Sequence, residues 1–544
     1  MATITFSSRD LEQKGLDIAT LKDLVPRFGI AIEKISGDDI VFEITPNRPD
    51  LLDFVGFVRA LLNFSGTRQP KENRYAIGNA PAMEIRVTHA VSGVRPFIAG
   101  IVVKGVDLTG NNLRYLINFT EKLCDTHGRK RKKFAVGLHN LDVISAPLTY
   151  DAARKEAFVP LGSNVKMSFE RIIKEHAKGI EYSHTLEAGK NGTYPYLMDA
   201  KSNILSMIPI INSEFTRVTE KTKNLFVDIT GTSRNGVDQA ASMLACSFID
   251  MGAEVYPCTV SYAKEKVVTP IMKYKDVKVG IFEIQRSIGA PVDQDKVVQL
   301  ANRLGHVAAK YEKSLLARIA PYRIDVLNEQ DVIEDIAIAY GYNKIVPIPV
   351  ISMSHGLLEE KTEYAGRLAV VMVGLGFTEA MNMYLTNEKV NFDSMMRKYD
   401  ANEAVRVSYS KTENMTMLRT NILHELLQNL GISKNERMPQ RMFEIGSVFS
   451  VKGGKPVEGR HMAFVSEHSR ANFSEIKAFT ESAMKHMRIE SHTIEDAHDS
   501  AFIEGRCAAI KVNGRTIGHF GELHPKVLEN FGLEEPAVAA EIEL

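Results

Sequence analysis

The sequence predicts a multidomain α+β protein, and three features of the chain support this fold class. Its 544 residues are more than one hydrophobic core usually organises, so about three to five domains are expected. Hydrophobic residues make up 44% of the chain and charged residues 25%, which is typical of globular proteins. Segments with strand-like alternation and segments with helix-like periodicity both occur, separated by polar or proline-containing stretches such as Gln69–Pro81 and residues 347–349.

Charge and cysteine content restrict the class of protein. Lys and Arg together number 67, as do Asp and Glu, so the chain is not a generally basic nucleic-acid binder, and no DNA partner is expected. The four cysteines show no CxxC spacing, which predicts neither a zinc site nor a disulfide framework. No apolar run of about 18 residues and no signal-peptide character are present, so we expect a soluble, cytoplasmic protein without membrane contact.

The first predicted unit, residues 1–82, combines short strands with helices. Strands are expected at Ala2–Phe6 and Ile40–Ile44, and a helix is expected at Leu16–Phe28. The phrase ThrProAsnArgProAsp, residues 45–50, is interpreted as a rigid turn because its prolines forbid a regular helix or strand. Asp50 is predicted to cap the helix that follows, Asp53–Phe64.

The second predicted unit, residues 83–267, contains a helix around residues 116–123 that leads into five consecutive basic residues, 129–133. This basic run has two interpretations: a solvated loop, or an edge that a phosphate backbone could reach, because the strand Phe134–Leu138 follows at once. Further along, residues 196–200, 204–213 and 227–231 are apolar strands that end in small polar groups. Such ends are common in loops, and they also occur around binding pockets.

The third predicted unit, residues 268–347, contains the helix Asp293–Leu304 and the segment Pro321–Ile345, interpreted as a strand that runs into a helix near Asp331 and stops at Gly341. Three carboxylates of this helix share one face, and one more ends the strand. Two interpretations remain open: a solvated acidic first turn favoured by the helix dipole, or a site for a hard cation such as Mg²⁺. The carboxylates are those of Asp325, Asp331, Glu334 and Asp335.

The last predicted unit, residues 348–544, alternates helices with strands. Helices are expected over Glu363–Gly374, Glu413–Leu430 and Glu475–Met487. Strands are expected over Arg441–Ser450, Arg460–Val465 and Ala508–Val512.

Two phrases carry a resemblance to a known family. The run PYRIDVL…DVIEDIAIAYGYNKI resembles the magnesium-bearing module of phenylalanine–tRNA ligase beta subunits, and EKLCDTHGRKRKKFAVGLHNLD resembles the opening of their editing domain, with Cys124 where a histidine is expected. The resemblance implies that Mg²⁺ is bound by Asp325, Asp331, Glu334 and Asp335. It also implies an editing pocket, which hydrolyses tyrosine wrongly attached to the phenylalanine tRNA, lined by Leu197, Ser206, Asp228 and Thr230. No Ser-His-Asp or Cys-His pattern occurs in that region, so a positioned water is expected to attack.

The resemblance covers the whole chain and implies a domain for each unit. These are an N-terminal α/β domain (1–82), an editing and tRNA-binding domain (83–267), a winged-helix-like magnesium-bearing module (268–347) and a catalytic-like domain of class II synthetase fold with an antiparallel sheet (348–544). A working class II site needs an Arg-x-Glu phrase and a second Arg, whereas residues 440–446 offer Arg-x-x-Glu and residues 521–528 carry no Arg. Arg441 is therefore interpreted as structural, and no aminoacylation residue is assigned to this chain.

The expected function is that of a beta subunit of the shorter, archaeal type. The family assembles two alpha and two beta chains; the alpha chain holds phenylalanine and ATP, and the assembly charges the phenylalanine tRNA. An alternative is a non-enzymatic assembly or tRNA-adaptor subunit that has lost editing, which the cysteine at position 124 favours. A third possibility is a free-standing deacylase.

Overall fold

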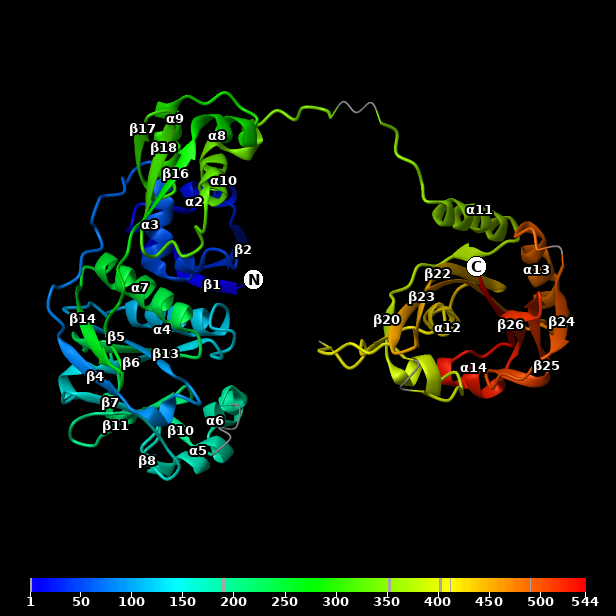
Figure 1. The fold of residues 1–544 in the computed structure, drawn as a ribbon, viewed down its shortest axis with the longest axis horizontal. Helices are drawn as coiled ribbons and strands as arrows, with labels where there is room; N and C mark the ends of the chain where they lie inside the picture. Colours follow the sequence, from blue (N-terminus) through cyan, green and yellow to red (C-terminus); the bar gives the residue numbers. More distant parts are fainter. Residues whose placement is uncertain (1, 187–191, 351–353, 401–403, 411, 490) are drawn as a thin grey trace. The chain divides into compact units, whose positions relative to one another are not determined.

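The computed structural model describes residues 2–186, 192–350, 354–400, 404–410, 412–489 and 491–544. These residues form two compact units, 1–349 and 350–544, which are described separately (Figure 1). None of the helices within the described residues is both long and apolar enough to cross a membrane.

The N-terminal part of the first unit is an antiparallel sheet in the order β1 (Ala2–Ser7), β3 (Asp39–Ile44), β2 (Ala31–Ser36). The helices here are α1 (Ser8–Glu12), α2 (Ile18–Phe28) and α3 (Phe54–Ser65). The turn after β3 becomes the short 3₁₀ helix Pro49–Leu52. The predicted cap was wrong: Asp53 accepts the Gly56 amide, because Arg48 binds the buried Asp50 carboxylate at 2.9 and 3.0 Å.

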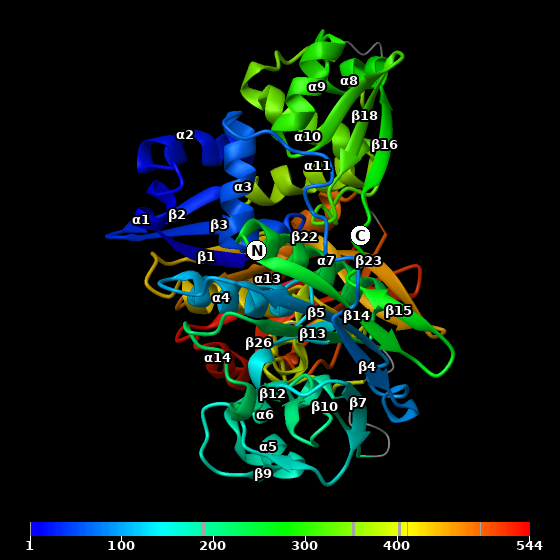
Figure 2. The same ribbon diagram turned by 90° about the vertical axis from the view of Figure 1, so that its left-hand side faces the viewer.

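The middle of the first unit is a mixed sheet. In spatial order its strands are β12 (Ile211–Asn212), β11 (Ile204–Met207), β10 (Tyr194–Met198), β7 (Leu148–Ala153), β4 (Met83–Val87), β14 (Glu254–Ser261), β5 (Phe97–Lys104), β13 (Leu225–Gly231) and β6 (Phe134–Asn140), with β15 (Lys266–Thr269) paired to β14. The pairs of β4 with β14 and with β7 are parallel. The helices α4 (Asn112–Asp125) and α7 (Arg234–Asp250) pack against this sheet, and β8 (Ala157–Phe158), β9 (Met167–Ser168), α5 (Phe169–Glu175) and α6 (Ala177–Tyr182) lie near β10 at one end of the unit (Figures 1 and 2).

The mixed sheet curls until its first and last strands meet. The Asn212 side chain of β12 donates to the Leu138 carbonyl oxygen of β6 at 3.1 Å. The two strands that end the spatial order therefore face each other across a seam, and residues from both can line a cavity there.

The third part of the first unit is the antiparallel sheet β16 (Lys275–Gly280), β18 (Ser314–Ile319), β17 (Val307–Tyr311), with helices α8 (Ile281–Ile288), α9 (Gln294–Arg303) and α10 (Glu329–Tyr340). The strand predicted after Pro321 is wrong: the strand ends at Ile319, and irregular chain follows because Arg323 turns inward. The helix predicted near Asp331 is confirmed as α10. Asn328 and Asp331 form a capping box at the start of α10, and Gly341 caps its end.

The second unit is a sheet in the order β19 (Thr378–Glu379), β22 (Gln440–Lys452), β23 (Lys455–Glu467), β27 (Ala537–Glu543), β26 (Arg515–Leu523), β25 (Phe502–Val512), β24 (Thr493–Asp496), antiparallel except for β19 with β22. The helices are α11 (Glu360–Gly374), α12 (Leu423–Ile432), α13 (Phe473–His486) and α14 (Pro525–Phe531), and β20 (Leu385–Thr386) pairs with β21 (Met417–Leu418). The predicted helix 413–430 was too long, because residues 417–418 pair as a strand before α12 begins.

Candidate functional site

A cavity of about 540 Å³ opens at the seam of the mixed sheet, and we call it the seam cavity. Its walls come from β6, from β11 and β12, from β13 and from one face of α4. Its volume lies within the range of about 300–1,000 Å³ that is common for ligand pockets. The polar and charged residues that line it are Thr120, Glu121, Arg131, His176, Lys178, Ser206, Asn212, Ser213, Thr216, Arg217, Asp228 and Thr230.

Strand register explains why space is left beside two of the predicted pocket residues. On β13, Asp228 lies directly opposite Gly137 of β6, and Thr230 lies opposite Ala135. Directly opposed residues of antiparallel strands share a face, so the small residues of β6 leave room next to the polar ones of β13. A Cβ atom at position 137 would lie 2.1 Å from Asp228 Oδ2, so this approach requires glycine.

The hydroxyl groups of the cavity have hydrogen-bonding capacity to spare. Ser206 Oγ is buried and has no hydrogen-bond partner in the described part of the chain. Thr230 Oγ1 accepts from Arg95 Nε at 3.2 Å, while Arg95 Nη2 binds the Thr230 carbonyl oxygen at 2.8 Å. Burial lowers the pKa of Arg95 to about 10, so it remains a cation at neutral pH. Because Arg95 takes a lone pair, the Thr230 hydroxyl hydrogen is available to a ligand.

Sequence reasoning missed His139. Its Nε2 lies 2.8 Å from Asp228 Oδ2, and its Nδ1 lies 2.8 Å from Thr216 Oγ1. The sequence analysis found no Ser-His-Asp or Cys-His pattern here, and the structure joins a threonine, a histidine and an aspartate instead. The missing signal is strand register: alternation along β6 places Ala135, Gly137 and His139 on one face, but the pairing of β6 with β13 cannot be deduced from local sequence.

Two other residues singled out in the sequence lie outside the cavity wall. Leu197 is fully buried in a neighbouring hydrophobic cluster with Leu205 and Phe226, although Ser206 is its direct partner across β10 and β11. Cys124 is buried in the main core, and burial raises the pKa of its thiol to about 11, so the thiol stays uncharged. The structure thus places Ser206, Asp228 and Thr230 in the wall of one cavity, and Leu197 is not part of that wall.

The basic run beside the cavity is ordered by its backbone. Arg129, Lys130 and Arg131 have positive φ angles of 52°, 51° and 64°, a strained conformation for three consecutive L-residues. The Arg131 guanidinium donates to the carbonyl oxygens of Pro209 and Ile210 at 2.9 and 3.1 Å and lies 3.8 Å from the Tyr182 ring centroid. The run is therefore more than a solvated loop, because one of its residues forms part of the cavity wall.

The four predicted metal ligands line one cavity of about 320 Å³, which we call the acidic cavity: Asp325, Asp331, Glu334 and Asp335. Its other wall contains Thr45, Asn47 and Arg48, from the proline-rich turn of the N-terminal sheet. The turn and the acidic helix, which are far apart in the chain, thus face each other.

Most of this negative charge has partners within the chain. Arg323 binds Asp325 at 2.8 Å and Asp335 at 2.6 Å, and His306 binds Asp335 at 2.6 Å. Burial alone would raise the pKa of Asp335, but Arg323 and His306 lower it below its usual value. Asp331 accepts the backbone amides of residues 327 and 328 at 2.7 and 2.9 Å.

No group of three or more potential ligands in the described residues is placed to hold a metal ion. Magnesium usually takes only one or two carboxylates besides water. Of the four carboxylates, those of the exposed Glu334 and of Asp331 are the two that do not pair with Arg323. Asp325 and Asp335 are both already paired with Arg323.

Comparisons with known proteins agree over the whole chain. The chain is 37% identical to the phenylalanine–tRNA ligase beta subunit of Archaeoglobus fulgidus, across 100% of this chain and 98% of that one, and 33% identical to that of Methanosarcina acetivorans with the same coverage. The chain belongs to the phenylalanine–tRNA ligase beta-subunit family. Family models match residues 277–342 (tRNA synthetase B5 domain) and 346–544 (phenylalanyl tRNA synthetase beta chain CLM domain).

A solved structure resembles the first unit. The crystal structure of an N-terminal fragment of the phenylalanyl-tRNA synthetase beta subunit from Pyrococcus horikoshii aligns with a TM-score of 0.59 at 29% identity. It covers 63% of this chain and 100% of the fragment. This likeness supports a multidomain α/β arrangement with several sheets for the beta-subunit family member described here.

In the second unit of this beta subunit, charged groups of the sheet are paired internally. Arg441 binds Glu475 at 3.0 Å, and the fully buried Arg419 binds Glu444 at 2.7 Å. Glu541 accepts the Leu423 amide at the start of α12 and binds His461 at 2.7 Å. Arg441 thus has the ion pair expected of a structural arginine.

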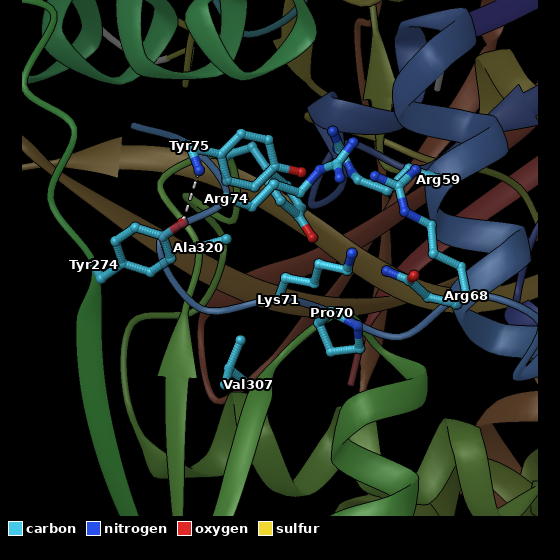
Figure 3. A pocket seen from close by; sticks show the side chains of 12 residues that line it. Arg59, Arg68, Pro70, Lys71, Arg74, Tyr75, Tyr274, Val307 and Ala320 are labelled. Atoms are coloured by element: carbon cyan, nitrogen blue, oxygen red, sulfur yellow. Dashed lines mark hydrogen bonds between the residues drawn. The ribbon is translucent and has the colours of Figure 1, made fainter. Parts of the chain in front are cut away.

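A third cavity of the beta subunit is too small for a substrate. It lies between Arg59, Arg68, Lys71, Arg74 and Tyr274 (Figure 3) and has a volume of about 20 Å³, room for a single water molecule. Asp250 accepts from all three arginines, at 2.6 to 3.0 Å. This cluster therefore joins α3 and the following linker to α7 rather than binding a ligand.

Proposed function

We propose that this beta subunit, in the cytoplasm, supports the ATP-dependent attachment of phenylalanine to its tRNA by a partner alpha chain, in an assembly of two alpha and two beta chains. We further propose that its seam cavity hydrolyses tyrosyl-tRNA formed by mistake. Family membership supports the first statement. The second rests on the unpartnered Ser206 hydroxyl, buried in the cavity beside Asp228 and Thr230.

The chemistry of the cavity suits a phenol. A hydrophobic pocket rejects an isostere with an added hydroxyl by only about 10²-fold, whereas accurate synthesis can require about 10⁴–10⁵, so a second site must select the wrong product. The tyrosyl hydroxyl can donate to the Asp228 carboxylate and accept from Thr230 or Ser206. A phenylalanyl group would leave these groups unpaired, at a cost of about 1–3 kcal/mol each.

The rim of the cavity suits a polynucleotide ester better than a free amino acid. Arg131, Lys178 and Arg217 line it, against Glu121. Cations at a rim attract the phosphates of an RNA strand, and their contribution weakens with salt. The attacking group would be a water molecule held by the polar wall.

Magnesium belongs to the same proposal. Glu334 and the remaining oxygen of Asp331 would hold the ion with several waters. When bound, the ion would offset negative charge at the acidic cavity. Aminoacylation itself would take place in the alpha chain, because Arg441 is engaged by Glu475.

The test uses the assembled enzyme and tyrosyl-tRNA. Asp228→Ala and Thr230→Val should each slow hydrolysis of tyrosyl-tRNA at least tenfold and leave phenylalanine charging nearly unchanged, because charging takes place in the other chain. Rates of deacylation and of charging are measured side by side, with Lys14→Ala, at an exposed position outside the basic run, as a surface control.

Two results would count against editing. Parent-like hydrolysis by both variants would move the activity away from the seam cavity. A parent enzyme that hydrolyses no tyrosyl-tRNA would favour the alternative, an assembly or tRNA-adaptor subunit. Cys124, whose identity first favoured this alternative, is buried and does not line the seam cavity.

A further inference from the structure

A chain of three side chains runs from one wall of the seam cavity to another. Asp228 and Thr216 both line the cavity, and His139 lies between them, 2.8 Å from each. The His139 ring is 0% exposed and does not line the cavity. It can therefore act on a substrate only through the two residues that it joins.

The surroundings hold the imidazole and the carboxylate in one arrangement. The His139 ring stacks on Phe226 with a centroid separation of 6.1 Å. Within the described residues, His139 is the hydrogen-bond partner of the Asp228 carboxylate, and the bond uses Oδ2. Gly137 permits this contact, since a Cβ atom there would overlap Oδ2. The second oxygen, Oδ1, is left for a ligand.

The donor and acceptor roles follow from the carboxylate. An ionised Asp228 can only accept, so Nε2 of His139 carries a proton toward it. In the neutral ring Nδ1 then accepts from the Thr216 hydroxyl at 2.8 Å, a shorter contact than the 3.5 Å between that hydroxyl and the Ser213 carbonyl oxygen. The bond from Nε2 thus fixes the direction of Oδ2 and, through the planar carboxylate, that of Oδ1.

We propose that His139 is the positioning residue that gives the seam cavity its preference for a hydroxyl-bearing aromatic ester, by holding Asp228 so that Oδ1 accepts the phenolic proton. This rests on the editing function proposed above. The residue is not catalytic, because it touches neither the substrate nor the reacting ester. Without it, Asp228 could rotate away, and the cavity would lose its discrimination between tyrosyl and phenylalanyl groups.

Two substitutions distinguish the hydrogen bond that the imidazole makes to Asp228 from the one that it makes to Thr216. In His139→Gln the amide nitrogen reaches about as far as Nε2 and can still donate to Asp228. In His139→Asn the shorter amide matches Nδ1 and can reach only Thr216. The measurement is kcat/KM for deacylation of tyrosyl-tRNA divided by that for phenylalanyl-tRNA, on the assembled enzyme. We expect His139→Asn to lower this ratio at least tenfold and His139→Gln to restore it to within about threefold of the parent.

The ratio separates this inference from a loss of folding and from the editing proposal. Equal ratios in the two variants, or a parent-like ratio in His139→Asn, would overturn the positioning role. If His139→Asn does not assemble, Gly137→Ala replaces it: its Cβ displaces the same carboxylate oxygen, and an unchanged ratio there would also overturn the proposal. A parent enzyme without tyrosyl-tRNA hydrolysis would instead overturn the editing function itself.

Discussion

The acidic cavity and the seam cavity both contain buried carboxylates, but they differ in how many partners the chain supplies. In the acidic cavity, Asp335 accepts from Arg323 and His306. In the seam cavity, Asp228 has His139, and the nearby Ser206 hydroxyl has no partner in the described part of the chain. In the first set the buried carboxylates have partners, although Nδ1 of the buried His306 has none in the described part of the chain. In the second set the Ser206 hydroxyl that lines the cavity has none.

The difference separates stability from recognition. A buried ion pair whose partners are all internal costs several kcal/mol to break, because the remaining charge stays buried. A buried polar atom without a partner costs stability in the free protein and returns that free energy when a ligand supplies the bond. In the seam cavity the unsatisfied Ser206 hydroxyl adjoins a space that a ligand can fill, and this combination indicates a binding site more directly than clustered charge does.

The largest effect is expected at Arg323. Arg323→Met would leave the buried carboxylate of Asp335 without its cation, so the free energy of unfolding should fall by about 3–5 kcal/mol. Chemical denaturation of the full chain, with hydrogen exchange of the α10 amides, measures the loss. The matched control is Arg286→Met, which removes an exposed pair with Glu283 and should cost about 0–1 kcal/mol.

Lowering the pH should reduce this difference. In the parent, the lowered pKa of Asp335 gives stability that is present above about pH 4 and is lost as the pH falls through the folded-state pKa. Without Arg323, burial is no longer offset, the pKa rises, and protonation relieves the buried charge. The gap between parent and variant should therefore narrow from pH 7 to pH 4. A gap that stays constant would mean that Arg323 stabilises through packing alone.

Local sequence predicted what depends on local contacts. The helix of the acidic segment, its glycine stop and the face shared by its carboxylates follow from periodicity and capping. The phrase AspIleThrGly, residues 228–231, likewise places Asp228 and Thr230 on one face of a strand through simple alternation. Both cavities therefore contain residues that the sequence had indicated.

Contacts between distant segments could not be predicted in the same way. His139 and Asp228 are 89 residues apart and meet through the register of β6 and β13. Arg323 turns inward because its partner Asp335 lies on the following helix, α10. For this reason the chain around Arg323 is not the strand that was predicted. Leu197 lies on a strand, as expected, but its side chain is buried in the neighbouring hydrophobic cluster. The curl of the sheet determines which side chains face the seam.

A smaller effect, of opposite sign for stability, is expected in the seam cavity. Ser206→Ala removes a buried hydroxyl without a partner, so the free energy of unfolding should stay constant or rise by up to about 1 kcal/mol. Hydrolysis of tyrosyl-tRNA by the assembled enzyme should nevertheless slow about tenfold. Denaturation and deacylation of the same preparation measure the two quantities.

Thr480→Ala is the matched control for Ser206→Ala, because Thr480 also has a buried hydroxyl oxygen without a hydrogen-bond partner but lies on α13 of the second unit. It should leave deacylation unchanged. If Ser206→Ala were destabilised and still hydrolysed tyrosyl-tRNA at the parent rate, the Ser206 hydroxyl would stabilise the fold instead of binding the substrate. The proposed difference between the two cavities would then be wrong.

The last effect concerns magnesium, and it should be modest because Arg323 already pairs with two of the four carboxylates of the acidic cavity. An ion held by Glu334 and Asp331 at about ten times its dissociation constant would add about 1.4 kcal/mol, or roughly 2–4 °C in the melting temperature. Melting curves in magnesium and in chelator should differ by this amount for the parent and for Glu329→Ala, an exposed first-turn control, and should coincide for Glu334→Ala. Coincident melting curves for the parent would mean that no magnesium ion is bound there and that the carboxylates form a solvated acidic first turn. A much larger rise would mean that the ion, rather than Arg323, balances the buried charge, and the contrast between a satisfied and an unsatisfied cavity would no longer hold.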